Sequence, residues 1–125
     1  MIDHVSVGVA DLARAAAFYD AVLGALGYAR LFTHPRAVGY GLPGDEDEAF
    51  AILAAGADAR APGSGCHVAF AARSREAVHA FHAAAVRAGA IDEGEPGPRP
   101  QYGEGYYAAF VRDPDGYRLE AVCHE

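Results

Sequence analysis

Two histidines and one glutamate stand at positions from which they could bind one metal ion together. His4 and His67 each open a segment with the alternation of a β-strand, and Glu120 lies in an apolar strand-like run near the end of the 125-residue chain. Imidazole nitrogens and carboxylate oxygens are donors that Zn, Fe, Mn, Ni and Co accept. Taken singly, each residue is more often an ordinary hydrogen-bonded or solvent-facing side chain than a ligand. Their places in an internal repeat favour a site for one divalent metal ion.

The chain contains two copies of one sequence pattern. A displacement of 63 positions carries His4 onto His67, and the same displacement carries the expected helix cap Asp11 onto Ser74. Since 6 of the 125 residues are His, a chance match at such a position is expected about once in twenty. We therefore predict a single domain built from two tandem modules and a Gly/Pro-rich connector. Module one, the connector and module two are residues 1–57, 58–65 and 66–125.

Both modules show the order β-α-β-β-β, which makes the fold class α+β. Apolar residues after Asp11 recur with helical spacing until 24–27, and a second helix follows Ser74 and ends at Gly89. The Pro/Gly-rich segment 92–105 is at most a short irregular strand. The predicted strands are 2–9, 28–34, 37–41 and 49–54 in module one, and one opening at 67 and a hairpin of 106–112 and 117–123 across the turn DPDG in module two.

Strand alternation places the candidate ligands on faces lined by small side chains, which leave a hollow. His4 shares its face with Ser6, and Glu120 looks into a similar hollow in the second module. The hairpin is expected to bring Tyr107 beside Glu120, where its hydroxyl could orient a substrate. Overlaying GDEDEAFAI at 44–52 on RDPDGYRLE puts Ile52 opposite Glu120.

Composition excludes several classes of function. The formal charge is −7, with ten Arg and no Lys, so no basic stripe is present to follow a nucleic acid, and no lysine can form a Schiff base. No run of 18 apolar residues occurs, so we expect no membrane-spanning segment. Cys66 and Cys123 lie far apart without a CxxC pair, and the N-terminus enters a strand pattern at once. A cytoplasmic protein is expected.

Three segments resemble the vicinal oxygen chelate superfamily, which includes glyoxalase I, fosfomycin-resistance thiol transferases, extradiol dioxygenases and bleomycin-resistance binding proteins. They are DHVSVGVAD with FYDAVLGALGY, GCHVAF, and YYAAFVRDPDGYRLEAV, and the resemblance covers nearly the whole chain. It implies that the two modules form a curved, partly closed mixed sheet, usually in a homodimer. It also implies metal ligands at His4, His67 and Glu120, with His4 meeting the other two across the dimer interface by analogy with several small members.

The leading functional hypothesis is a divalent-metal-dependent enzyme that acts on a small-molecule substrate as a lyase or isomerase, a transferase or a dioxygenase. In it Glu120, Tyr107 and Ser6 take part in catalysis. The loop 92–105 caps the substrate through Arg99, Gln101 and Tyr102. Ile52 stands where the resemblance would place the additional carboxylate of glyoxalase I, and this disfavours hemithioacetal isomerisation. The alternative is a non-catalytic protein that binds a drug or metabolite, as bleomycin-resistance members do.

Overall fold

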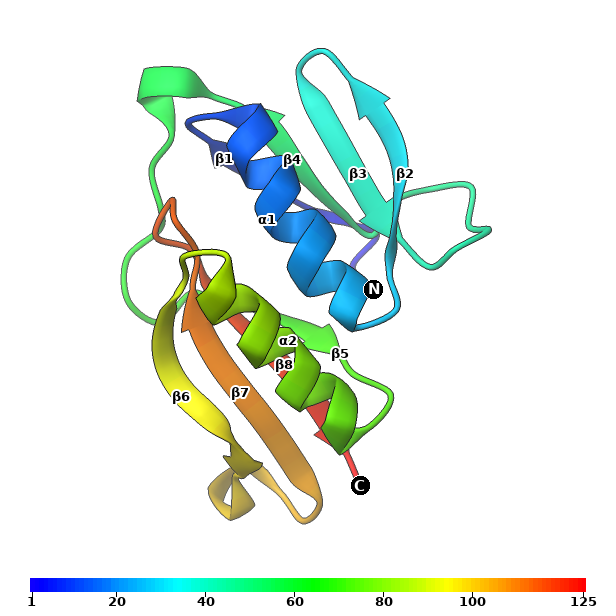
Figure 1. Ribbon diagram of the computed structural model, residues 1–125, viewed down its shortest axis with the longest axis vertical. Coiled ribbons are helices and arrows are strands. Elements are labelled where there is room, and N and C mark those ends of the chain that lie inside the picture. The colour runs from blue at the N-terminus through cyan, green and yellow to red at the C-terminus, as the bar shows by residue number, and fades with distance from the viewer. The chain divides into compact units, whose positions relative to one another are not determined.

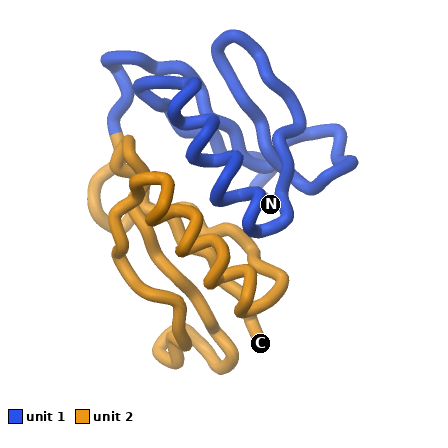
Figure 2. The backbone as a smooth tube through the Cα atoms, viewed as in Figure 1, with its two compact units in different colours: residues 1–60 blue, residues 61–125 orange.

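The computed structural model describes residues 1–125 and confirms the doubled β-α-β-β-β order, with two α-helices and eight β-strands. The chain divides into two compact units, unit 1 at Met1–Arg60 and unit 2 at Ala61–Glu125 (Figure 2). Each unit holds one helix and one open four-stranded sheet (Figure 1). Neither helix is long and apolar enough to cross a bilayer.

Unit 1 is a mixed sheet with one helix packed against it. Its sheet has the strand order β1-β4-β3-β2, in which β1 pairs parallel with β4 and the other pairs are antiparallel. Its elements are β1 Val5–Val9, α1 Leu12–Ala25, β2 Ala29–His34, β3 Ala37–Gly41, β4 Phe50–Ala54 and a 3₁₀ turn at Gly56–Asp58.

Helix α1 forms for the reasons the sequence indicates. The Asp11 side chain accepts a hydrogen bond from the backbone N–H of Arg14 at 3.1 Å and so satisfies one of the free amides at the helix start. The apolar stripe, which includes Phe18, Tyr19 and Val22, is almost fully buried. Tyr19 packs its ring against Phe50 of β4 with 5.1 Å between the ring centroids, and this contact holds the helix on the sheet.

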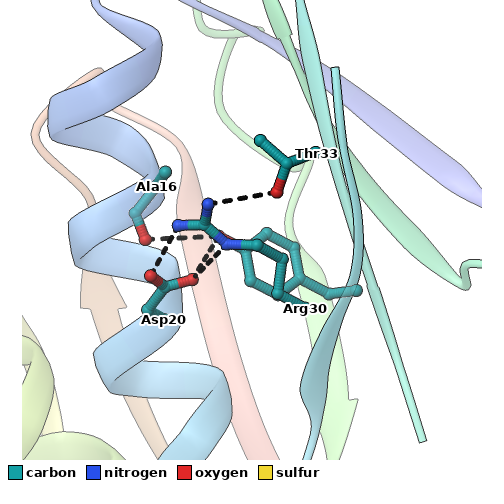
Figure 3. A network of polar contacts seen from close by, with 5 residues as sticks. Ala16, Asp20, Arg30 and Thr33 are labelled. Carbon is teal, nitrogen blue, oxygen red and sulfur yellow. Dashed lines mark hydrogen bonds and ion pairs between the residues drawn. The ribbon is translucent and has the colours of Figure 1, made fainter. Parts of the chain in front are cut away.

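A polar network ties α1 to β2 and β3 inside unit 1 (Figure 3). Arg30 donates to both carboxylate oxygens of Asp20, at 3.1 and 2.6 Å, and to the Thr33 hydroxyl at 3.2 Å. The buried Tyr40 hydroxyl donates to Asp20 at 2.9 Å and lies 3.2 Å from the Ala16 carbonyl oxygen. Burial and the neighbouring Asp20 carboxylate raise the pKa of Tyr40 well above its usual value.

Unit 2 repeats this architecture with the strand order β5-β8-β7-β6, in which β5 runs parallel to β8. Ser74 caps the second helix by accepting from the Ala77 N–H at 3.1 Å, as the repeat predicts. The side chains of Val78 and Phe81 are fully buried, and Gly89 adopts the expected left-handed conformation with φ of 100°. The elements are β5 Val68–Ala71, α2 Arg75–Arg87, β6 Ile91–Pro98, a 3₁₀ turn at Pro100–Tyr102, β7 Tyr106–Arg112 and β8 Arg118–His124.

The segment 92–105 is more regular than its composition indicates. Its first half, 92–98, belongs to the eight-residue strand β6, which pairs with β7 although it contains Gly94, Pro96 and Gly97. The strand is therefore longer than expected, while the expected irregularity is present as two shifts in its register. Strand β6 lies at the edge of its sheet, where a proline is tolerated because its nitrogen can face away from the neighbouring strand. Two register shifts accommodate the Gly and Pro residues.

The turn between β7 and β8 closes over three residues, 114–116. Asp113 donates its N–H to the carbonyl of Tyr117 at 2.8 Å, and its carboxylate accepts from the N–H groups of Asp115 and Tyr117. Gly116 takes the predicted positive φ, at 95°. Because the loop has an odd number of residues, residues paired across the hairpin are both even or both odd, as in Arg112 with Arg118.

Replacing Tyr40 by Phe tests the network in unit 1. A raised native pKa means that the Tyr40 contribution is present below the unfolded pKa of about 10 and is lost as pH rises above it. At pH 7 we expect Tyr40→Phe to lower the free energy of unfolding by about 1 kcal/mol. Above pH 10 the wild-type value should fall toward that of the variant. Urea unfolding followed by circular dichroism from pH 7 to 11 measures both effects, and parallel pH profiles of wild type and variant would contradict the assignment.

Candidate functional site

Two of the three predicted metal ligands lie together on one face of the unit 2 sheet. His67 directly precedes β5, and parallel pairing sets Ala69 of β5 beside Glu120 of β8. Since alternate residues share a face, the side chains of His67 and Glu120 meet there. Their Nε2 and Oε1 atoms are 3.0 Å apart, so an N–H on Nε2 donates to the carboxylate. The opposite face of this sheet packs against α2, as Figure 1 shows.

The Glu120 carboxylate is buried, with an exposed fraction of only 1% for the residue. Its second oxygen, Oε2, accepts a hydrogen bond of 2.5 Å from the Tyr106 hydroxyl of β7. Burial and the adjacent carboxylate raise the pKa of Tyr106 to about 12, because both disfavour the phenolate. Tyr106 therefore stays protonated at neutral pH and remains a hydrogen-bond donor to Glu120.

The prediction that Tyr107 lies beside Glu120 is wrong. Tyr107 pairs with Cys123 across the hairpin and faces α2, where its hydroxyl lies 2.7 Å from His79 Nε2. The expected placement requires a two-residue loop, which would pair odd with even residues. The three-residue loop instead places Tyr106 and Phe110 on the face of Glu120, with Phe110 directly opposite it.

The counterpart of Glu120 in unit 1 is Ala51 rather than Ile52. In unit 2 Glu120 pairs with Ala69, and the residue of unit 1 that is equivalent to Ala69 is Ser6, which pairs with Ala51. Ile52 points to the other face of its strand and is completely buried in the core of unit 1. The correction is one residue, and it leaves unit 1 without a carboxylate at this position.

A cleft of about 430 Å³ opens on unit 2 beside this pair. Its lining includes Tyr102, Phe110 and His67, and two charged residues, Glu93 and Arg118. The cleft reaches His67, whose side chain is 47% exposed, and not the buried Glu120 behind it. A ligand in this cleft would therefore meet the imidazole first.

The three residues predicted to cap a substrate differ in their surroundings. Tyr102 lines the cleft and packs edge-on to Tyr106, with 5.4 Å between the ring centroids. The Arg99 guanidinium carbon lies 5.5 Å from the centre of the Phe110 ring. Gln101 is exposed on the 3₁₀ turn. The structure therefore brings Tyr102 and Arg99 next to the cleft residues and shows no such contact for Gln101.

His4 and Ser6 belong to unit 1. His4 precedes β1 and is exposed, and its Nδ1 lies 2.6 Å from the Asp3 carboxylate. That hydrogen bond is the main cause that raises the pKa of His4. Ser6 lies in β1 with an exposed side chain. Both side chains are therefore open to a ligand or to another chain.

The paired residues of unit 2 fit a metal ion as a partial donor set. Two donors that each lie about 2.1 Å from one cation at a right angle stand roughly 3 Å apart, which agrees with the His67 to Glu120 distance. The Tyr106 bond to Oε2 holds the carboxylate in place, and Oε1, which accepts from His67 Nε2, would face a cation in place of that hydrogen bond. No group of three or more His, Cys, Asp and Glu side chains gathers closely enough to hold a metal ion.

Tyr106, Glu93 and Arg118 are site residues that sequence reasoning missed. The three-residue hairpin type of DPDG, with Gly at its third loop position, would have identified Tyr106 through the parity of the pairing. Alternation along β8 by itself predicts that Arg118 and Glu120 share one face, but not that Arg118 lines a cleft. Nothing comparable marks Glu93, because its position depends on the irregular register of β6.

Comparisons with known proteins identify the family. The model of the Glyoxalase/Bleomycin resistance protein/Dioxygenase superfamily matches residues 1–121. A solved glyoxalase/bleomycin resistance protein from Albidiferax ferrireducens T118 is 38% identical over 95% of both chains, with a TM-score of 0.82. No curated protein matches the chain at a significant level.

More distant structures share the fold. A glyoxalase-related enzyme from Fulvimarina pelagi is 24% identical over 98% of this chain and 86% of that chain, with a TM-score of 0.73. The fosfomycin resistance protein FosX from Listeria monocytogenes is 16% identical over 98% of this chain and 91% of that chain, with a TM-score of 0.69. Because the family model spans nearly the whole sequence and the 38% identical relative matches over 95% of both chains, the chain belongs to the Glyoxalase/Bleomycin resistance protein/Dioxygenase superfamily.

Proposed function

We propose that the protein is a divalent-metal-dependent enzyme whose metal ion chelates oxygen atoms of a small substrate. The observation that carries this proposal is the 3.0 Å pair of His67 and Glu120 beside the cleft of unit 2. Members of the superfamily commonly bind a divalent metal ion, and the superfamily includes enzymes. Two donors of the expected types, next to a cleft large enough for a small molecule, support the same role here.

The third ligand in this proposal is His4, the counterpart of His67 in the repeat. It is exposed, and its Nε2 atom has no partner in the structure, so a cation could be bound there. We propose that His4 is supplied within a homodimer, in which one subunit offers His4 to the pair on its partner. Ser6 follows on the same face of β1 and would present its hydroxyl to the substrate.

Different residues of unit 2 would have different roles in such a metal site. A bound divalent ion would act as a Lewis acid that stabilises negative charge on the substrate oxygens. Tyr106 keeps the Glu120 carboxylate oriented by donating to Oε2, and His67 forms the wall between Glu120 and the cleft. Tyr102 and Phe110 would exclude water from one side of the substrate.

The residue at position 51 limits the classes of reaction that this site could catalyse. Ala51 occupies the register position equivalent to Glu120, so unit 1 offers no carboxylate there that could move a proton. This disfavours a glyoxalase-type isomerisation and favours transfer of a nucleophile or an oxygen-dependent reaction at the same metal ion.

The second candidate function is binding of a drug or metabolite without turnover. One observation favours it: both oxygens of Glu120 already have hydrogen-bond partners within unit 2, so the buried carboxylate is satisfied without a cation. In that case His67, Tyr106 and Glu120 form a polar cluster that shapes the cleft.

Substitution of Glu120 by Gln tests the metal site. The amide side chain has nearly the same shape as the carboxylate and still accepts from Tyr106, so the fold should be retained while a charged ligand is lost. We expect metal affinity, measured by calorimetry with Zn²⁺, Mn²⁺ and Ni²⁺, to fall by about 100-fold or more. Glu104→Gln, at an exposed glutamate of the same unit, is the matched control. Equal affinities for wild type and Glu120→Gln would rule the ligand assignment out.

The two neighbouring tyrosines of β7 test how Glu120 is oriented. Tyr106→Phe removes the donor to Oε2, and we expect a loss of about 10-fold to 100-fold in metal affinity. Tyr107→Phe is the control, because its hydroxyl faces His79 on α2, and it should bind metal like wild type. The same calorimetric titration compares the two, and a larger loss in Tyr107→Phe would reverse the roles assigned to them.

Turnover separates the enzyme from the binding protein. The metal-loaded protein is assayed with thiols and electrophiles, with catechols and oxygen, and with 2-oxoaldehydes. We expect product formation in one of the first two assays and its loss in Glu120→Gln. Binding of such compounds without product, with each metal ion in turn, would support the binding function instead.

A further inference from the structure

Glu93 of the cleft wall shares its single negative charge between two arginines, of which Arg118 also lines the cleft. Glu93 faces two arginines, Arg112 and Arg118. Arg112 takes the carboxylate in a fork, with Nε to Oε1 at 3.2 Å and Nη2 to Oε2 at 2.9 Å. Arg118 approaches it only through Nε, at 3.5 Å, which is longer than a hydrogen bond. One carboxylate thus serves two guanidinium groups, and Arg118 has the weaker contact.

The outer nitrogens of Arg118 are available to a ligand. Its side chain is 43% exposed, it lines the cleft, and neither Nη atom has a partner in the structure. The Nε contact with Glu93 turns that edge of the guanidinium inward. The two Nη groups remain exposed to the cleft as a fork that matches the two oxygens of an anion. A planar fork of this kind recognises carboxylates and phosphonates by geometry as well as by charge.

Arg118 also lies close enough to the proposed metal ligands for one small molecule to contact both. It lies two residues before Glu120 on β8, so both belong to the same face and their Cα atoms are about 7 Å apart. A small molecule bound at Arg118 would therefore extend toward His67 within the same cleft. The rings of Phe110 and Tyr102 provide apolar surface along this path.

Arg99 is a further cation near the cleft, and each of its Nη groups already donates to a backbone carbonyl. Its Nη2 donates to the Glu95 carbonyl at 2.8 Å and its Nη1 to that of Pro98 at 3.3 Å, while its plane covers Phe110. A side chain at Gly94 or Gly97 would come within 3.2 Å of these nitrogens, so the two glycines make room for the guanidinium. Arg99 is thus held against Phe110 by the backbone of β6 and does not itself line the cleft.

We propose that Arg118 is the anion-recognition residue of the cleft and that the substrate is a small organic acid. Its carboxylate or phosphonate group binds the Nη groups of Arg118, and its apolar body lies against Phe110 and Tyr102. The opposite end carries the oxygen atoms that reach the metal ligands. The inference rests on the proposed function for that last contact only, because anion recognition by Arg118 requires no metal ion.

Binding of benzoate and its neutral analogue benzamide to metal-free protein tests this proposal. Both are titrated by NMR at pH 7.5 in the presence of a chelator. We expect wild type to bind benzoate at least about 10-fold more tightly than benzamide, and Arg118→Met to remove this difference. Phenylphosphonate is the third probe, and its affinity relative to benzoate shows which of the two anionic groups the Nη fork of Arg118 prefers.

Two further variants separate recognition from structural damage. Glu93→Gln removes the carboxylate that competes for the guanidinium groups, so benzoate binding should tighten by about 3-fold or more, the opposite direction from Arg118→Met. Arg87→Met, at an exposed arginine on α2, should leave all three affinities unchanged. Equal binding of benzoate and benzamide by wild type, or unchanged benzoate binding in Arg118→Met, would overturn the proposal.

The proposed metal site and the proposed anion site can be tested independently of each other. Glu120→Gln should keep the preference for benzoate over benzamide while it loses metal affinity, and Arg118→Met should keep metal affinity while it loses that preference. If Glu120→Gln lost the preference for benzoate and kept its metal affinity, both assignments would be contradicted. Glu120 would then be needed to recognise the anion and not to bind the metal ion.

Discussion

The structure of unit 2 depends on one constraint, the burial of the Glu120 carboxylate in a sheet. A buried carboxylate is costly unless its oxygens are paired, and here the partners come from separate elements, His67 before β5 and Tyr106 on β7. The pairing therefore fixes the register of three strands at once. A slip of one residue in β8 would turn Glu120 toward the apolar core under α2 and expose Leu119. The same constraint that specifies the fold presents the imidazole to the cleft.

The two units share one scaffold and use it differently. In unit 1 an aromatic on the edge strand, Phe32, pairs with Gly39, and in unit 2 the glycine is on the edge strand, where Gly94 pairs with Phe110. The exchange moves the ring next to the last strand of unit 2, opposite Glu120. The polar network of unit 1 joins its helix to its sheet, whereas that of unit 2 lies on the face away from α2. The repeat thus explains the fold, and the departures from it mark the candidate site.

Hydrophobic spacing was sufficient to predict the helices, their caps and the order of strands, because these features depend on contacts between near neighbours in the sequence. The sequence also predicted that His67 and Glu120 share a face, since alternation along two strands decides it. It misplaced Tyr107 and Ile52 by one position each. In both cases the error lies in the register between strands, which depends on the loop between β7 and β8 and on the pairing of β1 with β4.

The sequence by itself determined the superfamily, the doubled α+β architecture and the residue types of the candidate site. Only the tertiary structure decided that Tyr106 orients Glu120, that Ala51 is its counterpart, and that Arg118 lies beside the cleft with its outer nitrogens free. The physical reason is that composition and periodicity are properties of one segment. Hydrogen bonds between side chains of different strands depend on a register that a single loop residue can shift, and with it every side chain changes face.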